Sequence, residues 1–182
     1  MNINIGAGIW RKEGWLNLNC HSPHYDKQGY LDEYTDIWYN LVSDKPLPFK
    51  DEYVDKFYCS MVFEHISDKH VQHTIDECYR CLKRYGSFLV VVPVPLHDVR
   101  QFFRRLNMLQ WGFSYNHAEN GRHINFFTFG KLRKMFMEGG FVSVKKLPVS
   151  DIDECFKSYV KLALYVEGIK YGRNIKRRIG RT

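Results

Sequence analysis

The sequence contains no apolar run that is long enough to cross a membrane. A transmembrane helix needs about 18 consecutive apolar residues, whereas the longest run here, residues 88–96, is shorter and contains two prolines. We interpret this run as a buried strand. Residues 1–4 also lack the basic start and the long apolar stretch of a signal peptide. We therefore expect a cytoplasmic protein without a membrane span.

Cysteine is scarce, and its pattern excludes a disulfide framework. The five cysteines are odd in number and scattered along the chain. Cys78 and Cys81 form a CxxC spacing, but they fall within a helical pattern and have no second pair, so we interpret them as part of a half-buried helix face. No metal site is predicted, because the spacing does not place His70 or His73 on one helix face with Glu64.

The length predicts one domain with a sizeable core, since 182 residues contain no internal repeat and no low-complexity segment. We expect the domain to cover residues 1–170, with a substrate-side insertion at 95–125, where hydrophobic periodicity is weak. Residues 171–182 form a basic tail, which contributes to the net charge of +7. Such a tail can bind nucleic-acid phosphates, but a solvated chain end is the favoured interpretation.

Apolar segments separated by turn residues predict an α/β chain. Strands are expected at 2–5, 15–19, 36–41, 53–60, 87–94, 141–147 and 159–169. One helix is expected from Ser67 or Asp68 to 83–84, stopped by Gly86, and another between Thr128 and residues 139–140. Only nine residues, 6–14, join the first two strands. A parallel crossover usually needs a dozen or more, so the first crossover helix must be short or missing.

Two segments point to a ligand site at the ends of strands. Gly6 and Gly8 follow the first strand, where the absence of side chains lets a ligand approach the backbone. Residues 46–66, PLPFKDEYVDKFYCSMVFEHI, combine a proline-bounded turn, an acidic bend, a strand and a Glu-His pair. A dinucleotide fingerprint would need glycine or alanine where Arg11 stands, which argues against an NAD or FAD enzyme.

The block at 46–66 and five further segments resemble the motifs of class I S-adenosylmethionine (SAM) dependent methyltransferases, in particular the small methyltransferase type 11-like family. The further segments are INIGAG, GWLNLN, DECYRCLKRYGSFLVVVPV, HINFFTFGKLRKMFMEGGF and LALYVEGIK. The resemblance implies a Rossmann-like, mostly parallel seven-stranded sheet with an antiparallel last strand. It also implies SAM as cofactor and S-adenosylhomocysteine as product.

The resemblance further implies which residues contact the cofactor. Gly6, Ala7 and Gly8 would surround its methionine part, Asn19 would reach the ribose hydroxyls, Asn40 and Leu41 would lie along the adenine, and Ser60, Met61 and Val62 would line the floor. The family usually has acidic residues where Asn19 and Asn40 stand. Because charge-assisted hydrogen bonds are roughly twice as strong as neutral ones, we predict weaker SAM binding than in relatives.

Methyl transfer is an in-line displacement that needs alignment and, for a protonated acceptor, a base. The candidate catalytic residues are His65, His97, His117 and His123, with Tyr115 and Asp98 as secondary choices. A surface or structural role is the alternative for each. The predicted reaction methylates a small polar or sugar-like acceptor. The alternatives are a non-catalytic SAM-binding or scaffold relative, and an RNA methyltransferase that uses the tail, although the NPPY or DPPY motif of base amino-methylation is absent.

Overall fold

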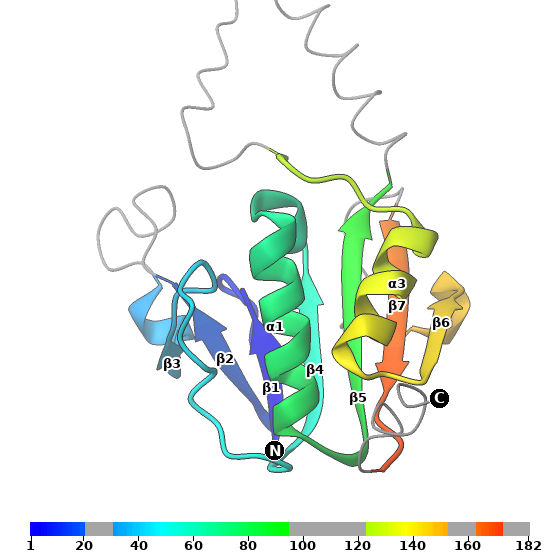
Figure 1. The fold of residues 1–182 in the computed structure, drawn as a ribbon. Helices are drawn as coiled ribbons and strands as arrows, with labels where there is room; N and C mark the ends of the chain where they lie inside the picture. Colours follow the sequence, from blue (N-terminus) through cyan, green and yellow to red (C-terminus); the bar gives the residue numbers. More distant parts are fainter. Residues whose placement is uncertain (21–30, 95–122, 153–162, 173–182) are drawn as a thin grey trace, which may run out of the picture.

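A computed structural model describes residues 1–20, 31–94, 123–152 and 163–172, which build one seven-stranded sheet (Figure 1). The strands are β1 (Asn2–Ile5), β2 (Trp15–Asn19), β3 (Ile37–Trp38), β4 (Val54–Ser60), β5 (Leu82–Pro93), β6 (Ser143–Leu147) and β7 (Ala163–Ile169). Their order in the sheet is β3-β2-β1-β4-β5-β7-β6. All pairs from β3 to β5 are parallel, and β7 is antiparallel to both of its neighbours. The predicted sheet, with its antiparallel last strand, is confirmed.

The connection between β1 and β2 contains no helix, as expected from its length. A folded loop takes the place of the missing helix on the sheet face opposite α1. The ring of Trp10 packs there against Trp15 and Tyr58, at centroid distances of 6.5 and 6.2 Å. The side-chain amide of Asn17 donates hydrogen bonds to the carbonyls of Trp10 and Tyr34. The loop therefore covers this part of the sheet with aromatic side chains and is fixed to β2.

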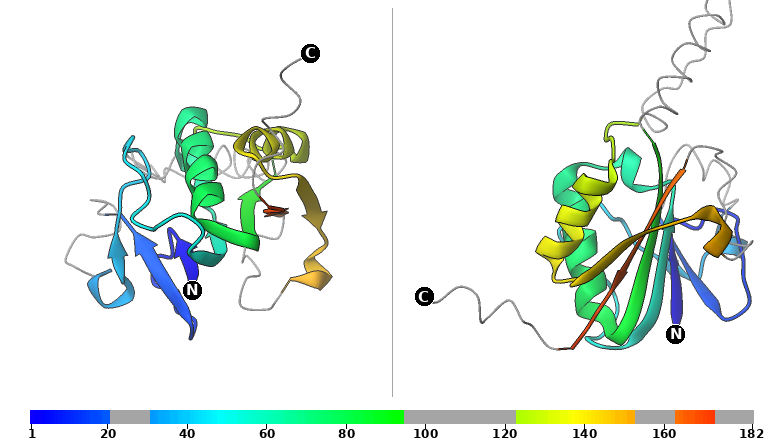
Figure 2. Two further views of the ribbon diagram at one scale, coloured as in Figure 1. Left: turned by 60° about the horizontal axis from the view of Figure 1, so that its bottom comes forward. Right: turned by 90° about the vertical axis from the view of Figure 1, so that its right-hand side faces the viewer.

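Helix α1 (Asp68–Cys81) packs on the face of the sheet that carries the main core (Figures 1 and 2). Val71 and Ile75 are completely buried against the sheet, as are Cys78 and Cys81. Burial raises the pKa of the Cys78 thiol well above its ordinary value, and the neighbouring Cys81 adds to this effect. Both cysteines of the CxxC spacing thus lie on the inner face of α1 and are more deeply buried than the half-buried face expected from the sequence.

The predicted end of α1 near residues 83–84, with Gly86 as its stop, is wrong. The helix ends at Cys81, and β5 begins at the next residue, Leu82, and not at residue 87 as predicted. Lys170, which follows β7, caps the helix instead, because its ammonium group donates to the carbonyls of Tyr79 (2.9 Å) and Leu82 (2.7 Å). Gly86 serves a close approach of strands: a Cβ there would lie 2.8 Å from the Asp55 carbonyl oxygen.

Helix α3 (Phe129–Gly139) lies beside α1 on the same face (Figures 1 and 2). Thr128 caps it as predicted, since its Oγ1 accepts a hydrogen bond from the Lys131 N–H. Gly140 ends it with a φ of +110°. The predicted inward residues Leu132, Met135 and Phe136 are all buried. No helix in the described parts of the chain is long and apolar enough to span a membrane.

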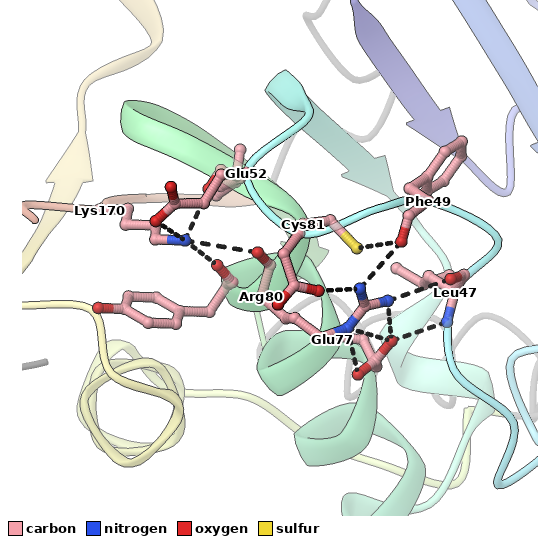
Figure 3. A network of polar contacts seen from close by, with 10 residues as sticks. Leu47, Phe49, Glu52, Glu77, Arg80, Cys81 and Lys170 are labelled. Atoms are coloured by element: carbon pink, nitrogen blue, oxygen red, sulfur yellow. Dashed lines mark hydrogen bonds and ion pairs between the residues drawn. The ribbon is translucent and has the colours of Figure 1, made fainter. Parts of the chain in front are cut away.

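Charged side chains tie the block at 46–52 to the C-terminal half of α1 (Figure 3). The guanidinium of Arg80 donates to the carbonyls of Leu47 (3.1 Å) and Phe49 (2.9 Å) and pairs with Glu77 at 2.7 Å. Lys170 lies beside Arg80 and approaches Glu52 at 3.8 Å. A hollow of about 490 Å³ lies among these groups. These charged groups lie at the amino-terminal end of the parallel strands, where they join residues 46–52 to α1.

Three other boundaries differ from the expectation. Strand β3 is shorter than 36–41, because the Asn40 side chain accepts a hydrogen bond from the Val42 N–H and turns the chain. Strand β4 begins one residue later than predicted. Strand β6 begins at Ser143, while Phe141 packs its ring against Phe136 at 4.9 Å.

Candidate functional site

The candidate site lies where β1, β2 and β4 end side by side. The register pairs Ile5 of β1 with Leu18 of β2 and with Cys59 of β4. The residues that follow these pairs therefore meet at one edge of the sheet. The strand order reverses at β1, and ligands of open α/β sheets bind at the carboxyl ends of strands at such a point.

The glycine loop after β1 is packed directly against the end of β4. The N–H of Gly6 donates to the carbonyl of Leu18 at 2.7 Å, and its φ of +66° lies in the left-handed region that favours glycine. A Cβ at Gly6 would lie only 2.3 Å from Cγ2 of Val62. Gly8 also has a positive φ, +55°, but no atom of the described residues lies within 4 Å of the place where its Cβ would stand. The loop thus has one crowded glycine and one glycine that faces open space.

Asn19, at the end of β2, binds this loop with its side chain. Its Oδ1 accepts a hydrogen bond from the Gly8 N–H (2.9 Å), and its Nδ2 donates to the Gly8 carbonyl (3.1 Å). Nδ2 also donates to Oγ1 of Thr35 at 2.9 Å, and Thr35 donates in turn to the carbonyl of Leu31. Asn19 is 3% exposed. Its amide therefore joins the glycine loop to the segment that precedes β3.

The end of β4 contains a strained residue. Ser60, Met61 and Val62 are all partly exposed at the sheet edge. Met61 has a φ of +55°, which is uncommon for a residue with a side chain. Its N–H donates to the Val91 carbonyl of β5 at 2.9 Å. Strained backbone of this kind is concentrated at functional sites.

On the far side of β2, the segment after β3 offers one exposed and one buried residue. Asn40 is exposed, and its Oδ1 is used by the turn to Val42. Leu41 is 8% exposed and belongs to the main core. The two residues predicted to lie along the adenine thus differ in their access to a ligand.

A short helical turn, η2 (Phe63–His65), follows the end of β4 and gathers three polar side chains. Glu64 is 1% exposed, and its Oε1 lies 3.9 Å from Nε2 of His65. The ring of His123 meets the ring of His65 edge to face, with centroids 5.0 Å apart. The N–H of His65 donates to the Val62 carbonyl at 3.0 Å. These three side chains therefore lie one turn beyond the end of β4.

Part of the chain matches a known protein family. Residues 26–90 match the family model described as a methyltransferase domain. This segment runs from before η1 (Asp32–Tyr34) into β5 and includes the end of β4. Residues 26–90 therefore resemble a methyltransferase domain, and the sheet has the Rossmann-like arrangement of the methyltransferase fold.

Solved structures of methyltransferases share the fold of this chain. A SAM-dependent methyltransferase from Archaeoglobus fulgidus has a TM-score of 0.62 at 13% identity, over 93% of this chain and 85% of that chain. One from Methanosarcina mazei has a TM-score of 0.59 at 15% identity, over 93% and 92%. The methyltransferase solved with the Haloferax volcanii Trm112 methyltransferase activator has a TM-score of 0.58 at 16% identity, over 94% and 82%. No curated protein matches the chain.

The residues predicted for the methyltransferase site fall into two groups. The nine cofactor residues lie at or near the ends of β1, β2, β3 and β4, and their contacts with SAM stay predictions. Of the predicted bases, His65 and His123 are brought together. His97, His117, Asp98 and Tyr115 lie outside the described residues, as do most of the 95–125 insertion and of the basic tail.

Two residues of this region were not among the predicted site residues. Thr35 precedes β3 and contacts Asn19, but no local pattern in the sequence indicates this pairing. Glu64 was recognised as part of a Glu-His pair at the start of a helix. Its proximity to His123 depends on two segments that are far apart in the sequence, so spacing could not predict it.

Proposed function

We propose that the chain binds SAM at the carboxyl ends of β1, β2 and β4 and transfers its methyl group to a small polar or sugar-like acceptor. The observation that carries this proposal is the packing of the Gly6 backbone against Val62 at the point where the strand order reverses. These are the two segments that resemble the glycine loop and the cofactor floor of class I methyltransferases.

The residues at this edge fit an extended nucleoside ligand. Open space above Gly8 leaves room for the methionine part beside Gly6 and Ala7. Ser60, Met61 and Val62 offer a partly exposed floor, and Asn40 and Leu41 border the side on which the adenine would lie. Bound SAM supplies an activated methyl group on a sulfonium sulfur. The chain's own part is to hold the loop, orient the ligand and keep water away from the reacting atoms.

His65 and His123 are the proposed proton acceptors among the described residues. The N–H of His65 donates to the carbonyl of the proposed floor residue Val62, and this closeness along the backbone is why His65 is offered as a base beside the cofactor. A neutral imidazole near pH 7 accepts a proton from an acceptor hydroxyl or amine without a strong base elsewhere. His97 and His117, in the proposed substrate-side insertion, are offered for the same role.

One observation favours a second candidate function, a SAM-binding or scaffold relative without turnover. The family usually has a charged acceptor at position 19, whereas the amide of Asn19 is buried and hydrogen-bonded to Gly8 and Thr35. Hydrogen bonds from the ribose hydroxyls to this neutral amide would be weaker than those to a carboxylate. The RNA methyltransferase alternative rests on the basic tail beyond residue 172.

Thermal unfolding with S-adenosylhomocysteine tests cofactor binding. A ligand at 100 times its Kd stabilises the folded state by about 2.7 kcal/mol, which corresponds to roughly 5–10 °C in a domain of this size. We expect such a rise with S-adenosylhomocysteine and none with NAD. Gly8→Leu should abolish the rise, because its side chain fills the open space.

Gly14→Leu is the matched control for this experiment. Gly14 has a φ of +76° and no atom within 4 Å of its Cβ position, so the substitution strains the backbone as Gly8→Leu does. It precedes β2, however, and lies away from the proposed site. An unchanged melting temperature of the wild type with S-adenosylhomocysteine would contradict the proposal. Binding with no transfer of labelled methyl from SAM to any polar acceptor would favour the second candidate.

A further inference from the structure

We propose that Glu64, His65 and His123 bind a divalent transition-metal ion of the zinc class. Each residue offers one ligand atom, and these atoms all lie within 4.8 Å of one another. Ligand atoms of a tetrahedral zinc ion, with Zn–N distances of about 2.0–2.1 Å, stand about 3.4 Å apart. Small side-chain rotations would shorten the distances between the ligand atoms from 4.8 Å or less to this value. The distance from Nε2 of His65 to Oε1 of Glu64 is already 3.9 Å.

The backbone holds the two parts of this site together before any ion binds. The N–H groups of Ile124 and Asn125 both donate to the carbonyl of Glu64, at 2.8 and 3.1 Å. The side chain of Asn125, which is 7% exposed, donates to the carbonyl of Ile66 and to Asp68. The segment that carries His123 is therefore fixed on η2, and an ion would gain affinity because little ordering is left to accomplish.

The donor set selects the class of ion. Two imidazoles and one carboxylate suit Zn²⁺, Co²⁺ and Ni²⁺, whereas Mg²⁺ and Ca²⁺ prefer oxygen ligands alone. Three protein ligands leave coordination positions for water or a substrate, as in catalytic rather than structural zinc sites. An ion could reach the site from solvent, because both histidines are partly exposed. The buried Glu64 lies on the inner side of the site, beside β4.

The buried carboxylate supports a cationic ligand. Glu64 is 1% exposed and lies near the buried Cys59 of β4, so its carboxylate is shielded from water. A carboxylate in such surroundings is stabilised by an ion of opposite charge. His65 and His123 then supply the other two protein ligands from the open side of the site.

The use of this ion in catalysis rests on the proposed function, although its binding does not. Bound one turn beyond Val62, the ion would hold an acceptor hydroxyl next to the cofactor and lower the pKa of that hydroxyl. In the metal-bound protein His65 and His123 would act as ligands and not as bases, so the proton of the acceptor hydroxyl would pass to water. The acceptor class would be an alcohol or a hydroxy acid that chelates a divalent ion.

Titration of the full chain with Zn²⁺ and Co²⁺, without SAM or acceptor, tests the site. We expect one ion per chain, a visible Co²⁺ absorption typical of low coordination number, and a Zn²⁺ Kd that rises about 100-fold or more in His123→Ala. His73→Ala is the matched control, because His73 lies on α1 and contacts the Lys45 carbonyl. It should leave the Kd unchanged.

X-ray absorption of the Zn²⁺-loaded wild type provides a readout that does not depend on how the variants fold. Two imidazoles in the first coordination sphere are expected. The proposal is overturned by a wild-type Kd in the millimolar range, by equal affinities of a folded His123→Ala and the wild type, or by fewer than two imidazoles. Since S-adenosylhomocysteine binding is measured separately, failure of the metal site and failure of the proposed function give different results.

Discussion

The side-chain amide of Asn19 holds Gly8 with both of its polar atoms, accepting from the Gly8 N–H and donating to the Gly8 carbonyl. The same amide nitrogen donates to Thr35. An ionised carboxylate could accept from the Gly8 N–H but could not donate to the carbonyl, because it has no N–H. At this position the chain thus carries a residue that fixes the glycine loop to β2.

We expect Asn19→Asp to destabilise the protein by about 1–3 kcal/mol, because the buried carbonyl of Gly8 and the hydroxyl of Thr35 lose their donor. The variant should gain no affinity for S-adenosylhomocysteine, although it restores the charge usual in the family. Urea unfolding followed by fluorescence of the four tryptophans, together with calorimetry of ligand binding, measures both quantities.

Thr35→Val provides the control for this substitution. It removes the hydroxyl that accepts from Asn19 but leaves both bonds to Gly8 in place. We expect a smaller loss of stability than in Asn19→Asp. Tighter binding of S-adenosylhomocysteine by Asn19→Asp would instead assign Asn19 to the ribose.

The sequence predicts the sheet well, because its constraints are local. Nine residues between β1 and β2 cannot hold a regular crossover helix, and Thr128 and Gly140 mark both ends of α3. The end of α1 was mispredicted because its cap, Lys170, comes from the far end of the chain. The pairing of His65 with His123 was missed for the same reason: it depends on backbone bonds between distant segments.

The two glycines of the loop should respond differently to alanine. Gly6→Ala combines a positive φ with a Cβ placed 2.3 Å from Cγ2 of Val62, whereas Gly8→Ala meets no atom. We expect Gly8→Ala to cost about 1 kcal/mol of unfolding free energy from backbone strain alone. Gly6→Ala should cost about 2–4 kcal/mol, since overpacking adds to this strain.

A double-mutant cycle separates the clash from the strain. Val62→Ala removes the γ-methyl groups that the new Cβ would meet, so it should recover part of the Gly6→Ala loss and none of the Gly8→Ala loss. Denaturant unfolding of the single and double variants measures the coupling. Equal coupling of Val62 to both glycines would contradict the close packing of Gly6 on Val62.

Glu77 should contribute to the acid limit of stability. Burial alone would raise its pKa, but hydrogen bonds from Arg80 and from the Leu47 N–H outweigh burial and lower the pKa below its ordinary value. A depressed carboxyl pKa stabilises the fold above the unfolded-state pKa of about 4.3. This contribution disappears as the pH falls through the lower pKa of the folded state.

Glu77→Gln should therefore lower stability by about 1–3 kcal/mol at pH 7, where it breaks charged hydrogen bonds. It should also flatten the decline of stability below about pH 4.5. Unfolding free energies measured from pH 7 to pH 3 check both effects. Glu138→Gln, on the exposed face of α3, is the control and should leave the acid limb unchanged.

Lys170 should be the strongest single cap of the fold. Lys170 is 4% exposed, and its ammonium group donates to the carbonyls of Tyr79 and Leu82, which α1 cannot satisfy itself. Burial lowers the pKa of Lys170, while Glu52 opposes this shift. Lys170→Met keeps the apolar stem and removes the donor, so we expect the free energy of unfolding to fall by about 2–4 kcal/mol.

Lys83→Met is the control. It breaks only the half-exposed pair with Asp55 and should lower the free energy of unfolding by less than about 1 kcal/mol. Urea unfolding of both variants decides the point, and equal losses would show that the carbonyls at the end of α1 do not depend on Lys170.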